Sequence, residues 1–374
     1  MGSLPSPPRP TTPPPSPENS PSGYRVYVPF CVREPMSNTN ISNWLESYNP
    51  LDHTWTYVSS IPELPENHAL KGFAMVSLGR SIYIIGGRLC RKERAHVSDK
   101  YVEPDPDEVL SSVLRYDICT KQWSLCAPLG VARYDFACTT FENKIFVAGG
   151  QSTLPRARGI SAAEVYDSDL NEWTPLPNMS TLRYKCVGVT WQGKIHVVGG
   201  FAERVDSDRS QPFISERSSA EVFDMQTGKW DLNMKMWQLD VPPNQIVELD
   251  GKLFSSGDCL NAWKGHIDAY DGVQNMWTVV EASRLKTLSS AGLTSDGHIE
   301  NWPQIQRLYL TVAPIGTHLY FLAGYQMAGE SSRSMSMVHI FDTSAARNAW
   351  RSYEPIEEVG GKELCSHCCV VQLS

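Results

Sequence analysis

No part of this sequence is apolar for long enough to cross a membrane. Nothing approaches the roughly 18 consecutive apolar residues of a membrane-spanning helix, and the first residues lack the apolar core of a secretory signal. We therefore expect a protein of the cytosol or the nucleus, without contact with membranes. In either compartment its ten cysteines are expected to be reduced thiols rather than disulfides.

The chain also has no excess of basic residues. Its 33 lysines and arginines are outnumbered by 41 aspartates and glutamates, which gives a formal net charge of -8. Nucleic acids and anionic membranes are polyanions, so neither attracts the molecule as a whole. We accordingly expect no nucleic-acid partner.

The motifs of common catalytic and metal sites are missing as well. The sequence contains no nucleophile elbow and no phosphate-binding loop. Its one metal-like cluster is Cys365, His367, Cys368 and Cys369, but a tetrahedral zinc site usually takes two separated ligand pairs. Adjacent Cys368 and Cys369 would also point to opposite faces of a strand. The sequence therefore predicts no catalytic residue, no metal and no cofactor.

What the chain does contain is a spaced pair of aromatic residues that occurs six times. Aspartate follows the first aromatic in five copies, and Asn49 follows Tyr48 in the other. Asx side chains close turns by accepting hydrogen bonds from backbone amides, so each copy predicts a hairpin. The pairs are Tyr48 with Trp55, Tyr116 with Trp123, Tyr166 with Trp173, Phe223 with Trp230, Tyr270 with Trp277, and Phe341 with Trp350.

A short apolar strand that ends in glycine precedes each pair from the second onward. Another strand comes before it, as 136–141 does before 145–148. One unit is therefore four strands, two before the glycines and two around the aromatic pair. The glycines are Gly86, Gly87, Gly149, Gly150, Gly199, Gly200, Gly257 and Gly324, with Asp258 and Ala323 at the two remaining positions.

This combined pattern resembles the Kelch repeat, which has a period of about 50 residues. The resemblance extends from about residue 24 to the C-terminus. It implies an all-β fold, a six-bladed Kelch-type β-propeller. In that family the glycines and aromatics are structural, because glycine permits positive φ and close backbone approach, while the aromatics fill the space between blades.

The two ends of the chain are expected to complete the sixth blade together. Five complete units occupy roughly residues 70–353, and the pair of Tyr48 and Trp55 lacks its upstream strands there. Residues 24–28 suit the second strand of that blade and residues 368–373 the first. The propeller would then span 23–374, with its sixth blade shared between about 23–59 and 363–374. Such closure leaves no open sheet edge between the first and last blades.

Residues 1–22 are expected to form a separate, disordered tail. They are rich in proline and contain almost no apolar residue, which favours polyproline II over a packed structure. The segment Pro7-Pro8-Arg9-Pro10 could serve as a ligand for a proline-binding module, and the Ser-Pro pairs as phosphorylation sites. A solvated tail is the simpler interpretation, because short proline motifs are compositional.

Kelch-like propellers include enzymes, which leaves a catalytic alternative. Galactose oxidase binds copper through tyrosine and histidine ligands, and no matching set is recognisable here. The plant specifier proteins carry an iron-associated Glu-x-x-x-Asp-x-x-x-His pattern, but after Glu103 and Asp107 this sequence has Ser111 at the histidine position. The sequence favours a binding protein without enzyme activity, and a catalytic constellation assembled from several blades is the alternative.

Five loops that follow the glycine strands are long, and in this architecture they share one face of the disk with the loops that enter each blade. Long loops on a rigid scaffold are where binding usually resides. The five loops are 88–109, 151–160, 201–216, 259–264 and 325–335. We predict a protein-binding face made of Arg88, Arg133, Tyr134, Arg156, Arg158, Arg183, Tyr184, Trp263, Arg307 and Tyr325.

Three of these arginines, Arg133, Arg183 and Arg307, occupy the same repeat position. We expect them to be exposed at the mouth of the channel, where planar guanidiniums would bind an acidic or phosphorylated segment of a partner protein. On that expectation, changing all three to alanine leaves the melting temperature nearly unchanged. The alternative is that each arginine donates to loop carbonyls within its own repeat.

Many plant Kelch proteins carry an F-box ahead of the propeller, which recruits them to a ubiquitin ligase. Neither an F-box nor a BTB-like segment is recognisable in this sequence. We expect a free-standing, monomeric interaction scaffold. Recognition of substrates for a ubiquitin ligase through a separate partner is the alternative.

Overall fold

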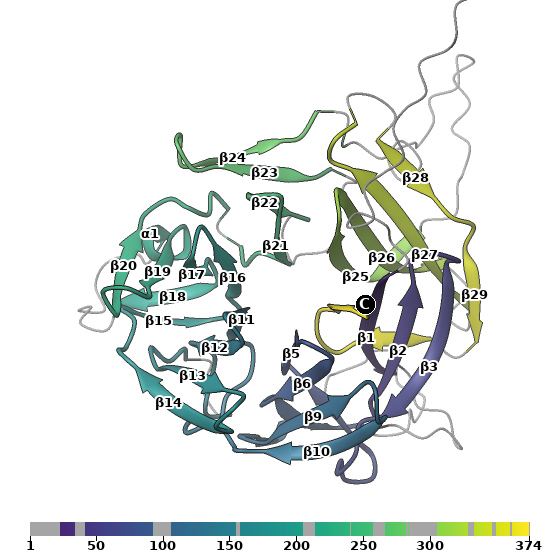
Figure 1. Ribbon diagram of the computed structural model, residues 1–374, viewed down its shortest axis with the longest axis horizontal. Helices are drawn as coiled ribbons and strands as arrows, with labels where there is room; N and C mark the ends of the chain where they lie inside the picture. Colours follow the sequence, from purple (N-terminus) through teal and green to yellow (C-terminus); the bar gives the residue numbers. More distant parts are fainter. Residues whose placement is uncertain are drawn as a thin grey trace, which may run out of the picture.

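The computed structural model describes residues 23–33, 42–92, 106–154, 158–204, 214–239, 241–256, 266–281, 283, 305–327, 333–345, 349–359 and 361–373. Regular structure in these segments is antiparallel strand, apart from one short helix, α1 (Ile214–Arg217). The sheets are arranged like blades around a common centre (Figure 1). The predicted tail, Arg156, Gly257 and Trp263 lie outside the described residues.

Five four-stranded sheets are each built from one stretch of the chain, in the all-β propeller arrangement that the repeat predicts. In each, the first strand lies innermost and the fourth outermost, and β29 (Ile356–Val359) adds to the last sheet. The first two sheets are β5 (Ala74–Leu78), β6 (Ser81–Ile85), β9 (Val113–Asp117) and β10 (Gln122–Cys126), and then β11 (Ala137–Phe141), β12 (Lys144–Ala148), β13 (Ala163–Asp167) and β14 (Glu172–Leu176). The next two are β16 (Val187–Trp191), β17 (Lys194–Val198), β19 (Ala220–Asp224) and β20 (Lys229–Asn233), and then β21 (Ile246–Leu249), β22 (Lys252–Ser255), β23 (Asp268–Asp271) and β24 (Met276–Val279). The last is β25 (Ile305–Ile315), β26 (His318–Met327), β27 (Arg333–Asp342) and β28 (Trp350–Ser352).

A further sheet joins the two ends of the chain. It contains β1 (Tyr24–Val32), β2 (Trp44–Asn49), β3 (Thr54–Ser60), β30 (Lys362–Leu364) and β31 (Cys369–Gln372). Strand β1 pairs with β31 in the register Tyr24 to Gln372 and Tyr27 to Cys369. The inner strands β31, β5, β11, β16, β21 and β25 contact one another in that order, and β25 contacts β31 again. The two ends therefore supply neighbouring strands of one sheet, which lies between the first and last of the other sheets.

The aspartates after the aromatics close the hairpins, as their chemistry predicts. The carboxylate of Asp117 accepts hydrogen bonds from the backbone amides of Cys119 at 2.9 Å and Thr120 at 2.8 Å. Asp167, Asp224 and Asp271 accept the equivalent pairs of amides in their own turns. Because these bonds join residues close in sequence, the hairpin of the third and fourth strands could be predicted from the sequence.

Each aromatic pair lies across the third and fourth strands of its sheet, with ring centroids from 5.0 to 5.3 Å apart. The tryptophan also reaches the preceding sheet. The indole N–H of Trp173 donates to the Ala127 carbonyl at 2.9 Å, and that of Trp230 donates to the Pro177 carbonyl at 2.7 Å. The aromatics therefore fill the space between blades and also tie each blade to the one before it.

Gly149 shows why the second strand ends in glycine. Its φ is 70°, and a Cβ there would lie 2.7 Å from the carbonyl oxygen of Arg183 in the segment that enters the next blade. A side chain at Gly149 would therefore push neighbouring blades apart.

Two histidines are buried within the sheets and should make stability depend on pH. Burial lowers the pKa of both His196 and His339 to about 4. In the unfolded chain each ring binds a proton below about 6.5. As the pH falls from 6.5 towards 4, these histidines bind protons in the unfolded chain but not in the folded one. The free energy of unfolding therefore decreases.

We expect the free energy of unfolding to fall by about 1–2 kcal/mol per buried histidine between pH 7 and pH 5. Denaturant titration at the two pH values measures this loss. In the double variant His196→Gln, His339→Gln the loss should be distinctly smaller, whatever its stability at pH 7. An equal loss in both proteins would show that other groups cause it.

Candidate protein-binding face

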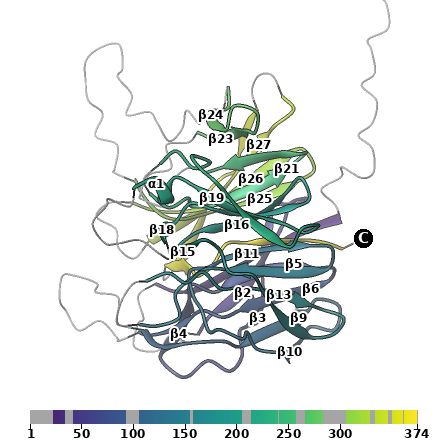
Figure 2. The same ribbon diagram turned by 90° about the vertical axis from the view of Figure 1, so that its left-hand side faces the viewer.

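The loops that leave the second strands are partly folded as short strands, which the sequence did not predict. Strand β7 (Arg88–Arg91) pairs with β4 (His68–Lys71) and β8 (Pro106–Val109), and β15 (Thr181–Tyr184) pairs with β18 (Phe201–Arg204). Each pairing joins the segment that enters a blade to the segment that leaves its second strand. Figure 2 places β4, β15, β18 and α1 on one side of the molecule and the C-terminus on the other. We call the side of β4 and β15 the loop face.

The prediction that Arg133 is exposed is wrong. Its side chain is 0% exposed and donates to the carbonyls of Gly149 at 2.9 Å and Ala162 at 2.8 Å. Its guanidinium also forms an ion pair with the carboxylate of Glu164, which is 4% exposed. Arg133 therefore satisfies buried polar groups within its own repeat, and no partner protein can reach it.

The corresponding prediction for Arg183 is wrong for the same reason. Its side chain is 0% exposed and donates to the carbonyls of Gly199 at 2.9 Å and Ser219 at 3.2 Å, and to the Thr181 hydroxyl at 2.7 Å. In both repeats the arginine binds the carbonyl of the glycine sixteen residues later. A shared repeat position thus reflects a shared structural role, which was the alternative interpretation.

Arg307 and Tyr325 lie in regular strands, not in loops. Arg307 is half-buried on β25, and its backbone pairs with that of Tyr325 on β26. Tyr325 is only 4% exposed, and its hydroxyl lies 3.3 Å from Nε2 of His339. The predicted loop 325–335 is replaced at both ends by the long strands β26 and β27, so Tyr325 belongs to the core of its blade.

Other predicted residues do come together on the loop face, with two that were not on the predicted face. The guanidinium of Arg88 stacks 5.1 Å from the ring centre of Tyr134, and that of Arg217 stacks 5.1 Å from the ring centre of Phe201. The rings of Tyr184 and Phe201 are 5.0 Å apart. We call Arg88, Tyr134, Tyr184, Phe201 and Arg217 the arginine–aromatic cluster.

Backbone hydrogen bonds between blades hold the two tyrosines of this cluster in place. The residues that follow them, Asp135 and Lys185, have φ angles of 53° and 52°. The amide of Asp135 donates to the Gly72 carbonyl at 2.8 Å, and the amide of Lys185 donates to the Asp135 carbonyl at 2.7 Å. Successive blades are therefore linked near the channel mouth, and the cluster sits on a rigid base.

The charges around the tyrosines have opposing effects. Burial raises the pKa of Tyr134 and Tyr184, while Arg88 acts against the rise at Tyr134 and Arg217 does so at Tyr184. Both hydroxyls are consequently protonated at neutral pH and can donate hydrogen bonds. Arg158, also predicted for this face, is exposed in the segment between β12 and β13.

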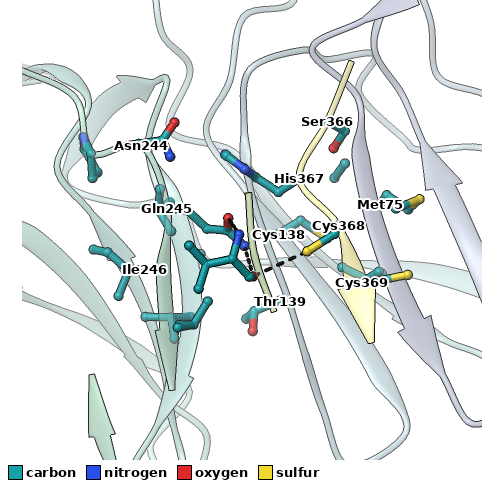
Figure 3. Close-up of a pocket in the computed structure, with 18 of the residues that line it drawn as sticks. Met75, Cys138, Thr139, Asn244, Gln245, Ile246, Ser366, His367, Cys368 and Cys369 are labelled. Carbon is teal, nitrogen blue, oxygen red and sulfur yellow. Dashed lines mark hydrogen bonds between the residues drawn. The ribbon is translucent and has the colours of Figure 1, made fainter. Parts of the chain in front are cut away.

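A cavity of about 750 Å³ occupies the centre of the ring and is lined by the inner strands (Figure 3). His367 lines it, and burial lowers the pKa of this imidazole to about 4. Burial also raises the pKa of Cys186 to about 11 and that of Cys368 to about 12, so both thiols are protonated at neutral pH. Among the described residues, no three His, Cys, Asp or Glu side chains lie close enough together to hold a metal ion.

Two adjacent segments match sequence models described as the Kelch motif, over residues 70–130 and 132–180. The chain is a Kelch-repeat protein. The matched residues contain Gly86, Gly87, Gly149 and Gly150 and two of the aromatic pairs, which belong to the sheet of β5, β6, β9 and β10 and the sheet of β11 to β14. The described part of this Kelch-repeat protein contains no helix with the length and hydrophobicity of a membrane span.

Relatives of this Kelch-repeat protein occur in plants and animals. One F-box/kelch-repeat protein of Arabidopsis thaliana is 30% identical over 63% of this chain and 54% of its own length. A second from the same plant is 32% identical over 34% of this chain and 31% of its own length. The human Kelch repeat and BTB domain-containing protein 12 is 26% identical over 34% of this chain and 20% of its own length. The chain thus spans between a fifth and about half of the length of these relatives.

Proposed function

We propose that this Kelch-repeat protein is an interaction adaptor that binds a partner protein through the loop face. The observation that carries the proposal is the arginine–aromatic cluster. Arginine and tyrosine are enriched at the hot spots of protein interfaces, because each combines a large flat contact area with hydrogen-bonding capacity. Four of these residues are partly exposed, whereas Tyr134 is only 6% exposed and supports the stacked Arg88. They lie on loops and short elements of a scaffold of hydrogen-bonded blades, the usual placement of a binding site.

The partner is proposed to present an acidic or phosphorylated segment. Arg88 and Arg217 lie against aromatic rings, Arg158 is exposed, and Lys185 is exposed between the cluster and the channel. A guanidinium that stacks on a ring through its flat face keeps the edge of its fork in the plane suited to a carboxylate or phosphate. Because the chain as a whole is negatively charged, an acidic segment is attracted to this local group of cations and repelled by most of the remaining surface.

The relatives favour a second, finer proposal. Their names contain F-box and BTB, so we infer that this chain recognises substrates for a ubiquitin ligase, with a separate partner linking it to the ligase. The protein would act as a monomer in the cytosol or nucleus. Its propeller would supply recognition and no catalysis.

The test is affinity purification followed by mass spectrometry with two matched double variants. Arg88→Ala, Arg217→Ala should reduce capture of the partners at least about tenfold, because hot-spot truncations commonly cost 2 kcal/mol or more. The control, Lys229→Ala, Lys252→Ala, removes two exposed cations from the strand ends away from the loop face and should retain them. Phosphatase treatment of the lysate then separates phosphorylated from acidic partners. Equal capture by both variants, each melting within a few degrees of the wild type, would refute the proposed site.

A further inference from the structure

Two buried cysteines lie side by side where the two ends of the chain meet. Cys31 belongs to β1 and Cys365 follows β30, and both are in the same buried cluster, 0% and 7% exposed respectively. Strand β1 pairs with β30 so that Cys31 lies opposite Glu363, and the amide of Cys365 donates to the Pro29 carbonyl at 3.1 Å. Side chains alternate along a strand, so Cys31, Glu363 and Cys365 project from the same face of the sheet. The two thiols are diagonal neighbours on adjacent strands, and both contact Glu363: Cys31 lies 3.9 Å from its carboxylate and Cys365 donates to its carbonyl at 3.6 Å.

Positive charge surrounds the first of these cysteines. The ammonium group of Lys92 donates to the sulfur of Cys31 at 3.2 Å and lies 3.4 Å from the Glu363 carboxylate. Lys71 forms a second ion pair with Glu363 at 3.0 Å. Two cations therefore face one carboxylate, and the remaining positive charge favours a thiolate at Cys31.

The two thiols consequently differ in acidity. The hydrogen bond from Cys365 lowers the pKa of Cys31, and the charge of Lys92 adds to this effect against the opposing effect of burial. Burial raises the pKa of Cys365 well above its ordinary value, and Cys31 beside it reinforces the rise. A thiol of lowered pKa beside one that stays protonated favours oxidation to a disulfide, because the thiolate form of the first is the nucleophile.

The pair adjoins the central cavity of the ring through Cys365, while Cys31 is 0% exposed behind it. Cys365 lines the central cavity, together with Ser366 and His367 of the same turn. Burial raises the pKa of Cys186 and Cys368, which also line the cavity, and at Cys186 it outweighs the opposing charge of Arg183. The position of Cys365 at the cavity and the contact of Lys92 with Cys31 therefore single out one pair of cysteines among those that the structure describes.

We propose that Cys31 and Cys365 form an oxidation-sensitive pair whose disulfide links the two ends of the chain. The oxidant is a hydroperoxide such as hydrogen peroxide. The Cys31 thiolate attacks one peroxide oxygen, the O–O bond breaks, and the departing hydroxide takes up a proton to become water. The sulfur of Cys365 loses its proton and attacks the sulfenic acid on Cys31, the S–O bond breaks, and a second water leaves. Two thiols are oxidised by two electrons, and one peroxide is reduced to two waters.

The disulfide would be a covalent cross-link within the sheet that joins the two ends of the chain. It encloses almost the whole propeller in one loop, so it restricts the unfolded chain. Small thiols reverse it by exchange. Oxidising conditions would therefore increase the resistance of the propeller to unfolding.

The experiment treats the purified full chain with one equivalent of hydrogen peroxide and digests it without reduction. Mass spectrometry should then find the Cys31 peptide linked to the Cys365 peptide, and the melting temperature should rise by several degrees and return after addition of a reducing thiol. The exposed Cys119 is the control site, and Cys119→Ser should leave the linked peptide unchanged. Lys92→Met keeps both cysteines and should slow the linkage about tenfold, because the thiolate loses its cation.

The wild-type result decides the proposal even if a variant fails to fold. Failure to find the linked peptide in peroxide-treated protein that still melts cooperatively would overturn it. So would linkage that forms equally fast in Lys92→Met, or that joins other cysteine pairs to a similar extent.

Discussion

Replacing Arg133 with alanine should destabilise the propeller by about 3–5 kcal/mol, the usual cost of removing one partner from a buried ion pair. The Glu164 carboxylate would remain at 4% exposure without its cation, and the carbonyls of Gly149 and Ala162 would lose a donor. Burying an unpaired charge or an unsatisfied carbonyl is among the largest single-residue penalties in a folded protein. Denaturant titration by fluorescence of the eleven tryptophans measures the loss.

Two matched variants make this prediction specific. Arg158→Ala removes an exposed arginine from the same face and should change stability by no more than about 0.5 kcal/mol. The double variant Arg133→Met, Glu164→Gln removes both charges and should recover part of the stability that Arg133→Ala loses, since no buried charge is left without a partner. An Arg133→Ala protein as stable as the wild type would mean that the guanidinium is solvated after all.

Deleting residues 365–374 should abolish the folded, soluble protein. The deletion removes β31, the innermost strand of the sheet that joins the two ends, and leaves the hydrogen-bonding edge of β1 open between residues 24 and 27. It also removes the contacts of β31 with β5 on one side and β25 on the other. An open strand edge pairs readily with other chains, so aggregation is the expected outcome.

Soluble yield and gel filtration measure the effect of the deletion. Point variants in β31 then distinguish loss of the strand's packing from the effect of shortening the chain. Val371→Asp places a charge at a position that is 1% exposed and should greatly reduce the soluble yield. Gln372→Glu introduces a charge at the exposed neighbouring position and should leave the yield unchanged. If the deleted protein elutes as a monomer and melts like the wild type, β31 is not needed to close the ring.

The hairpins were predictable because their causes are local. Asp117 and the amides of Cys119 and Thr120 lie within three residues of one another, and the same turn recurs in other units. The pairing of β1 with β31 could also be predicted, although these strands lie at opposite ends of the chain. It follows from counting the strands of the repeated unit. The aromatic pair nearest the N-terminus lacked its two upstream strands, and each end of the chain contained one segment suited to such a strand.

Whether Arg133 and Arg183 are buried or exposed was not predictable in this way. Their repeat position showed that they share a role, but arginine suits a binding surface and a buried carbonyl cluster equally well. The choice depends on Gly149, Ala162, Gly199 and Ser219, whose carbonyls converge only after the second and third strands have paired. The stacking of Arg217 on Phe201 was missed for a similar reason, since β15, β18 and α1 bring these residues together.

The sequence by itself thus determined the four strands of the repeated unit, the turns, the blade repeat and the joining of the two ends, because each depends on side chains acting over a few residues or on a count of repeated units. Only the tertiary structure decided which arginines are buried and which aromatics they accompany on the loop face. It alone placed Cys31 beside Cys365 and Lys92. Such placements depend on backbone groups and side chains from distant segments, and their positions are set only when neighbouring blades have packed.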